Sequence, residues 1–170
     1  MATPDFVLDL REKIGHTPLW LSGVTAVVVR DAAESAGSPG AHSVPGREVL
    51  LVKRADSGAW TPVTGIIDPG EEPAVAAERE VLEEADIVAR AESLAWVRVI
   101  PMIRYSNGDE SQYLDLVFRC SWVSGDPFPA DGENTEAAWF SVDALPAMSE
   151  DMRGRIHVAL AGNEATRFER

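Results

Sequence analysis

The chain has 170 residues, of which 45% are hydrophobic, and a formal net charge of −13. This length supports one domain with a sizeable core and is too short for two ordinary domains, so we expect a single domain over residues 1–170. The negative charge opposes binding to a nucleic acid polymer, because the field of the protein repels a phosphate backbone. A small nucleotide that carries Mg²⁺ remains compatible with it.

The only cysteine, Cys120, excludes an intramolecular disulfide and suits a reducing compartment. No apolar run approaches the ~18 residues of a membrane span. The first residues also lack the basic and apolar regions of a secretory signal. We therefore expect a cytoplasmic protein with no membrane partner.

The first third of the chain predicts one helix and two strands. Residues 1–15 should form an N-terminal helix, because a Thr-Pro pair near the start and a glycine at the end are typical helix boundaries. Apolar and β-branched residues predict strands at 19–30 and 48–54. Residues 31–46 are rich in Ala, Gly, Ser and Pro without an apolar period, so we expect a flexible hairpin loop there.

An extended segment at 60–67 and an Asp-Pro-Gly turn lead into a helix predicted over 73–85, with a proline in its first turn. On this helix Glu80, Glu83 and Glu84 have i, i+3, i+4 spacing, which places their carboxylates on one face. Such close like charges destabilise a bare helix, and a hard divalent cation would offset their repulsion. A solvated acidic face is the alternative interpretation.

The second half of the chain predicts a strand pair joined by a tight turn, because residues 106–109 contain an Asn-Gly dipeptide that is typical of hairpins. The elements expected there are strands at 94–105 and 112–123, a polar loop at 124–136, a strand at 137–142, a helix at 149–162 and a frayed tail at 163–170.

The stretch from Gly65 to Ile87 resembles the Nudix box, the signature of the Nudix hydrolases. The signature reads G, five residues, E, seven residues, R-E, an apolar residue, any residue, E-E, any residue, G, and an apolar residue. One position departs, since Asp86 stands where the family has glycine, just past the helix end where a left-handed backbone is common. Aspartate tolerates that backbone better than most residues, so we expect a cost of about 1 kcal/mol or less.

This resemblance implies an α/β fold, the Nudix-type α/β/α sandwich with a central mixed β-sheet. It also implies a MutT-like pyrophosphohydrolase that requires Mg²⁺, with Mn²⁺ as a substitute, and that forms a homodimer. The implied substrates are small nucleoside diphosphates linked to another moiety: ADP-ribose-like compounds, dinucleotides or nucleoside triphosphates. The alternative is a non-catalytic Nudix-like module that binds a nucleotide or sugar nucleotide, although such modules typically lose box carboxylates that this chain keeps.

By the same resemblance, Glu80 and Glu84 are the principal metal ligands. Glu83 completes the site or acts as the base, and the carbonyl of Gly65 supplies a further oxygen ligand. These assignments suit phosphoanhydride hydrolysis, in which a carboxylate-held cation neutralises phosphoryl oxygens and activates a water molecule.

Arg79 is expected to be an orienting residue whose guanidinium forks onto the structural carboxylate Glu71 and holds the loop against the helix. An exposed ion pair of little energetic value is the alternative. Many family members take an additional base from a loop after the box, and Glu136 is the preferred candidate here. The other candidates for the base are Glu133, Asp109 and Glu110.

Substrate contacts are expected from Arg54, Trp60 and Tyr105, through phosphate binding or stacking on a base. For the two aromatic residues, packing in the core is the alternative. The segment Trp60 to Gly65 (WTPVTG) departs from the W-x-apolar-P-G-G that is common in the family, which affects the substrate more than the chemistry. Pro101 follows the box where ADP-ribose hydrolases of the family often have a proline, although an edge or bulge proline is an equally simple interpretation.

Overall fold

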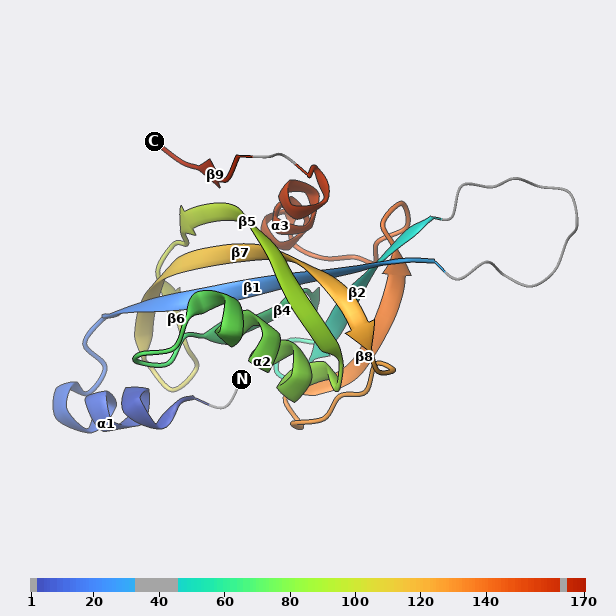
Figure 1. Cartoon of the computed structure of the whole chain (residues 1–170). Helices are drawn as coiled ribbons and strands as arrows, with labels where there is room; N and C mark the ends of the chain where they lie inside the picture. The colour runs from blue at the N-terminus through green and yellow to red at the C-terminus, as the bar shows by residue number, and fades with distance from the viewer. Residues whose placement is uncertain (1–2, 33–45, 163–164) are drawn as a thin grey trace, which may run out of the picture.

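The computed structural model describes residues 3–32, 46–162 and 165–170, which form one mixed sheet with helices on both faces (Figure 1). The helices are α1 (Asp5–Ile14), α2 (Pro73–Ala85) and α3 (Glu150–Leu160). The strands are β1 (Leu19–Asp31), β2 (Arg47–Arg54), β3 (Trp60–Thr61), β4 (Val63–Ile66), β5 (Val88–Val99), β6 (Ile103–Arg104), β7 (Glu110–Ser124), β8 (Asn134–Ser141) and β9 (Arg167–Phe168). The predicted α/β/α sandwich is confirmed.

Strand β1 is the centre of the sheet. It pairs antiparallel with β2 and β4 and parallel with β7, in a register from Leu19↔Ser111 to Val29↔Ser121. Residues 23–29 of β1 are all buried. This continuous burial explains the unbroken apolar run in the sequence, because a strand covered on both faces has no solvent side.

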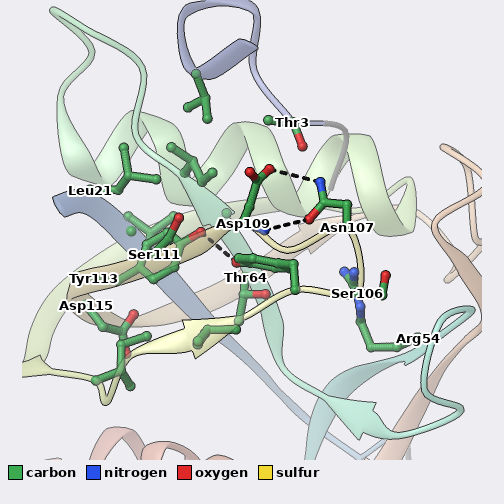
Figure 2. Close-up of a pocket in the computed structure, with 18 of the residues that line it drawn as sticks. Thr3, Leu21, Arg54, Thr64, Ser106, Asn107, Asp109, Ser111, Tyr113 and Asp115 are labelled. Atoms are coloured by element: carbon green, nitrogen blue, oxygen red, sulfur yellow. Dashed lines mark hydrogen bonds between the residues drawn. The ribbon is translucent and has the colours of Figure 1, made fainter. Parts of the chain in front are cut away.

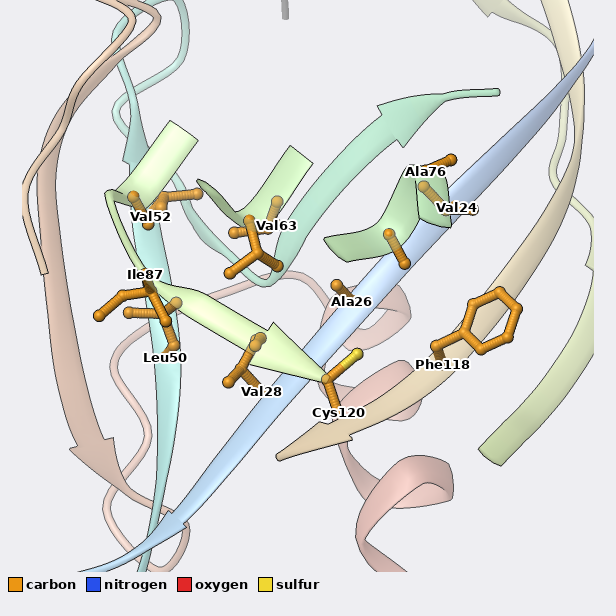
Figure 3. Packing of buried hydrophobic residues seen from close by; sticks show 14 residues of the cluster. Val24, Ala26, Val28, Leu50, Val52, Val63, Ala76, Ile87, Phe118 and Cys120 are labelled. Carbon is orange, nitrogen blue, oxygen red and sulfur yellow. The ribbon is translucent and has the colours of Figure 1, made fainter. Parts of the chain in front are cut away.

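Two apolar cores lie on opposite faces of the sheet. On the α2 face, Val28 and Phe118 pack with Ala76 and Ala77 of the helix, and Figure 3 shows this cluster. Cys120 belongs to the same core, and burial raises the pKa of its thiol to about 12. This cysteine is therefore a buried core residue. On the other face, α3 packs against β1, β2, β5 and β7.

The N-terminal helix predicted within residues 1–15 is confirmed as α1, which contacts the sheet through buried Val7, packed with Leu21 and Ile66. Most of the predicted flexible loop, residues 33–45, lies outside the described residues. Among the described residues, no helix has the length and apolar character needed to cross a bilayer.

Several predicted boundaries differ from the structure. Strand β5 begins at Val88, and β8 begins at Asn134 inside the expected polar loop. The prediction of a frayed tail is wrong for residues 165–170, because β9 pairs in parallel with β5 and Trp96 Nε1 donates to Glu169 at 3.1 Å. Residues 163–164 lie outside the described residues. Pairing so short a strand depends on the neighbouring β5 edge, which the sequence does not reveal locally.

Candidate active site

Helix α2 has the predicted bounds and delivers the acidic residues to the sheet. Pro73 stands at its first turn, and its buried face carries Ala76, Ala77 and Val81, small enough for a close approach to the sheet. The helix ends at Asp86 with φ 53° and ψ 33°. Aspartate thus adopts the left-handed backbone that the sequence predicted for this position.

Glu80 points from α2 onto Gly65 of β4. A Cβ atom added to Gly65 would lie 2.1 Å from Glu80 Cδ, so only glycine leaves room for this carboxylate. Burial raises the pKa of Glu80 to about 7, against the opposing charge of Arg79. A buried carboxylate with a raised pKa gains stability from any cation that favours its charged form.

Arg79 donates hydrogen bonds to five acceptors of the box, one of which is the backbone carbonyl of Ile66 at 3.2 Å. Its Nε and Nη2 donate to the two carboxylate oxygens of Glu71 at 2.8 and 2.9 Å, and its Nη1 donates to Glu80 and Glu83, each at 3.0 Å. Glu71 also accepts from the backbone amide of Asp68 at 3.1 Å. The expected fork of Arg79 onto Glu71 is therefore confirmed, and it fixes the loop before α2 against the helix.

Glu84 is the most deeply buried carboxylate of the box, at 1% exposure. Its Oε2 accepts a hydrogen bond from Asn134 Nδ2 at 3.1 Å, whereas its Oε1 is buried with no hydrogen-bond partner among the described residues. Burial raises the pKa of Glu84. A buried carboxylate oxygen without a partner costs about 1–3 kcal/mol or more, so this atom is arranged for something other than stability.

Glu84, Asp131 and Glu133 each offer a carboxylate oxygen, and these oxygens lie within 4.8 Å of one another. Asp131 and Glu133 come from the segment between β7 and β8. Oxygen ligands in such a group suit a hard cation such as Mg²⁺, and the unpartnered Glu84 oxygen gives the cation a position to fill. The residues present therefore fit a divalent metal.

The other predicted acidic residues lie elsewhere. The Glu83 side chain is half exposed beside Arg79. Glu136, the preferred base, is not in a loop but in β8, where it forms an ion pair with Lys53 at 2.7 Å. Among the described residues, the group around Glu84 includes Glu133 and not Glu136. The two remaining candidates lie at the β6–β7 hairpin, Asp109 beside Arg11 and Glu110 beside Arg104.

A cavity of about 400 Å³ opens between α1, β4, the β6–β7 hairpin and the start of α3 (Figure 2). Arg54, Tyr105 and Gly65 line it, so two of the three predicted substrate contacts share one space with the box glycine. Trp60 does not line this cavity and packs edge-on against Phe140, with ring centroids 4.8 Å apart. The contact with Phe140 agrees with the alternative interpretation of Trp60 as a packing residue.

The sequence did not single out Asp131 or Asn134. Both lie in a polar segment whose acidic and amide residues resemble those of an ordinary loop. Asn134 and Glu84 are 50 residues apart in the sequence, so no local spacing indicates that they are in contact.

Comparison with known proteins gives a consistent result. The family model described as NUDIX domain matches residues 40–159. A MutT-like protein from Streptomyces ambofaciens is 32% identical over 139 residues, 76% of this chain and 84% of that protein. The NAD-capped RNA hydrolase NudC of Pseudomonas aeruginosa PAO1 is 34% identical over 105 residues, 61% of this chain and 35% of that protein.

Solved structures agree on the fold. A NUDIX hydrolase from Nitrosomonas europaea has a TM-score of 0.61 at 27% identity and covers 85% of this chain and 90% of its own. An ADP-ribose pyrophosphatase from Streptococcus suis has a TM-score of 0.60 at 17% identity, covering 87% and 96%, and supports the fold alone.

The α/β/α sandwich keeps every carboxylate of the box, with Asp86 in place of its glycine, and buries two of those carboxylates, Glu80 and Glu84. The chain belongs to the Nudix hydrolase family. It spans about a third of the length of the curated NudC proteins that it matches.

Replacing Gly65 with alanine is expected to displace the Glu80 carboxylate, because the new Cβ would lie 2.1 Å from Glu80 Cδ. Nudix-type hydrolysis should fall about 10- to 100-fold, the usual consequence of disturbing the surroundings of a metal site. Steady-state kinetics would measure the loss. The matched control is Gly46→Ala, since nothing lies within 4 Å of a Cβ added there. Equal activity of the two variants would contradict the assigned place of Glu80.

Proposed function

We propose that the protein hydrolyses the pyrophosphate linkage of a nucleoside diphosphate joined to a second moiety, with Mg²⁺ as cofactor and Mn²⁺ as a substitute. The observation that carries this proposal is Glu84, whose Oε1 is buried without a hydrogen-bond partner among the described residues and whose carboxylate is grouped with Asp131 and Glu133. The alternative, a non-catalytic binding module, is less favoured because all box carboxylates are retained. Such a module has no need for an unpaired buried charge.

Glu84 and Glu80 are the proposed principal carboxylates of the metal site, and the Gly65 carbonyl is a further oxygen ligand. When bound, the cation supplies charge neutralisation at the phosphoryl oxygens and a water molecule of lowered pKa. Arg79 keeps Glu80 and Glu83 in fixed positions before substrate arrives. This preorganisation lowers the cost of reaching the transition state.

Glu133 replaces Glu136 as the proposed loop base. A base must reach the proton that it abstracts, and Glu133 lies in the group around Glu84. Glu136 instead faces Lys53 and accepts its hydrogen bond at 2.7 Å. Glu83, half exposed at the edge of the box, remains the second candidate.

The cavity suits an uncharged ring of the substrate. Four of its charged lining residues form two pairs: Arg11 with Asp109 at 3.5 Å, and Arg155 with Asp115 at 3.2 Å. The rest of the wall is largely apolar, with the hydroxyl groups of Tyr105 and Tyr113 2.7 Å apart. An apolar wall with a few fixed polar groups is typical of sites for nucleobase-sized ligands.

Arg54 is the cavity residue that also reaches the carboxylate group. Its Nη1 lies 3.6 Å from Glu133, and the side chain lines the cavity near Tyr105. We therefore propose that the substrate phosphates bind at Arg54 while the uncharged nucleoside or nicotinamide part occupies the cavity. ADP-ribose-like compounds and dinucleotides fit this arrangement, and the similarity to NAD-capped RNA hydrolases supports it.

A substrate panel tests the proposal. The protein is incubated with Mg²⁺ and ADP-ribose, NADH, NADPH, dinucleoside polyphosphates or nucleoside triphosphates, and phosphate is followed after phosphatase coupling. We expect turnover of at least one compound, loss of turnover with EDTA, and a lower kcat/KM for NADPH than for NADH. The last result is expected because Arg11 and Arg155 are already paired with acidic residues and Arg54 is assigned to the pyrophosphate, so an added phosphate finds no further cation in the cavity. Tight binding of one compound without turnover of any would support the binding module instead.

A further inference from the structure

Asn134 is the first residue of β8 and is 4% exposed. Its Nδ2 donates to Glu84 Oε2 at 3.1 Å, and within residues 3–32, 46–162 and 165–170 no other hydrogen bond to this carboxylate is found. The amide oxygen of Asn134 is itself buried without a hydrogen-bond partner among those residues. Its donor group is therefore satisfied by Glu84, and its acceptor group is not satisfied.

A β-bulge aims Asn134 at α2. In β8, Ala137 and Trp139 pack on the α2 face, whereas Phe140 packs on the α3 face. Strict alternation would place Asn134, three residues before Ala137, on the α3 face. The register shifts between Lys53 and Arg54, however, so that Thr135 is the extra residue of β8. Such a bulge re-aims a neighbouring side chain, and here it returns Asn134 to the α2 face.

The neutral amide of Asn134 makes the two oxygens of the Glu84 carboxylate different. One oxygen is held by Asn134, and the other has no hydrogen-bond partner among the described residues. The carboxylate also offers an oxygen to the group with Asp131 and Glu133. A lysine or arginine in place of Asn134 would neutralise the carboxylate and compete with a cation, whereas an amide fixes its orientation and leaves its charge available. Asp131, Glu133 and Asn134 also belong to one short segment, in which Asp131 Oδ1 accepts from the Glu133 amide at 2.9 Å.

We propose that Asn134 is a positioning residue that orients Glu84 for divalent metal binding. This inference rests on the proposed function, because it assumes that Glu84 is a metal ligand. Partners that orient a ligand in this way typically change metal affinity or activity about 10- to 100-fold when they are removed.

The test measures Mn²⁺ binding to the free protein by electron paramagnetic resonance, without substrate. Asn134→Leu keeps the shape and removes the donor, and Asn134→Ala is a second variant with a smaller side chain in case the first does not fold. Both should bind Mn²⁺ about 10- to 100-fold more weakly than the wild type. With an active substrate, kcat should fall while KM changes less than about threefold, since the substrate cavity is untouched. The matched control is Thr135→Val in the same bulge, which should retain wild-type Mn²⁺ affinity.

Mn²⁺ affinity within about twofold of wild type in a folded Asn134 variant would overturn the proposal. So would wild-type protein that binds no Mn²⁺. The proposed hydrolysis can fail independently of this inference. In that case the wild type binds Mn²⁺ but turns over no compound of the panel. If the Asn134 variants then bind Mn²⁺ more weakly, the positioning role of Asn134 stands and the proposed enzymatic function does not.

Discussion

Glu84→Gln is expected to lower kcat about 10²- to 10³-fold, comparable to the loss of a principal electrostatic stabiliser of a transition state. Glutamine has nearly the same shape, so it keeps the packing at this buried position and removes the charge that would hold the cation. The free energy of unfolding without metal should not fall, because the variant no longer buries an unpaired carboxylate oxygen. Steady-state kinetics and thermal unfolding on the same preparations measure both quantities.

The control for this prediction is Glu136→Gln. Glu136 is exposed and paired with Lys53, so its replacement should leave kcat within about threefold of wild type. A Glu84→Gln variant that retains near-wild-type kcat would show that the metal site is misplaced. A large loss in Glu136→Gln would restore that residue as the base.

Arg155→Met is expected to be the most destabilising single change proposed, with a loss of about 3–5 kcal/mol. Arg155 is 4% exposed, donates to Thr25 Oγ1 at 2.7 Å and lies 3.2 Å from Asp115, which is also buried. Removing the guanidinium leaves Asp115 with an uncompensated buried charge between α3 and the sheet. For a domain of this size the loss lowers Tm by roughly 6–20 °C, measured by calorimetry.

Two further variants separate this mechanism from general damage to α3. The double variant Arg155→Met with Asp115→Leu should recover more than half of the lost stability, because it removes both charges. Arg153→Met on the same helix should cost less than about 1 kcal/mol, since the Arg153 side chain donates a long hydrogen bond of 3.4 Å to the Pro146 carbonyl. A double variant no more stable than Arg155→Met would contradict the account of a buried pair.

The arrangement of the box could be predicted from the sequence because its residues are close together in the chain. Helical spacing alone places Glu80 and Glu84 on one face, and the αL position of Asp86 follows from the place where the helix must end. The fork of Arg79 onto Glu71 joins residues eight apart, within the same motif. These features needed no knowledge of the sheet, and all of them are present in the structure.

The remainder of the site depends on long-range pairing. Asn134 reaches Glu84 only because of a bulge opposite Lys53 and Arg54, and that register is a property of two strands. The grouping of Glu133 in place of Glu136 has the same origin, because β8 begins earlier than its apolar residues indicate. The paired charges of the cavity likewise come from α1, α3, β7 and the hairpin, which no single stretch of sequence brings together.

The most direct measurement of the central claim is anomalous diffraction from crystals grown with Mn²⁺. We predict a Mn²⁺ peak in contact with the Glu84 carboxylate oxygen that has no protein hydrogen bond, between Glu84 and Glu133. Manganese bound elsewhere, or no peak beside Glu84 in crystals of active protein, would contradict the proposed metal site.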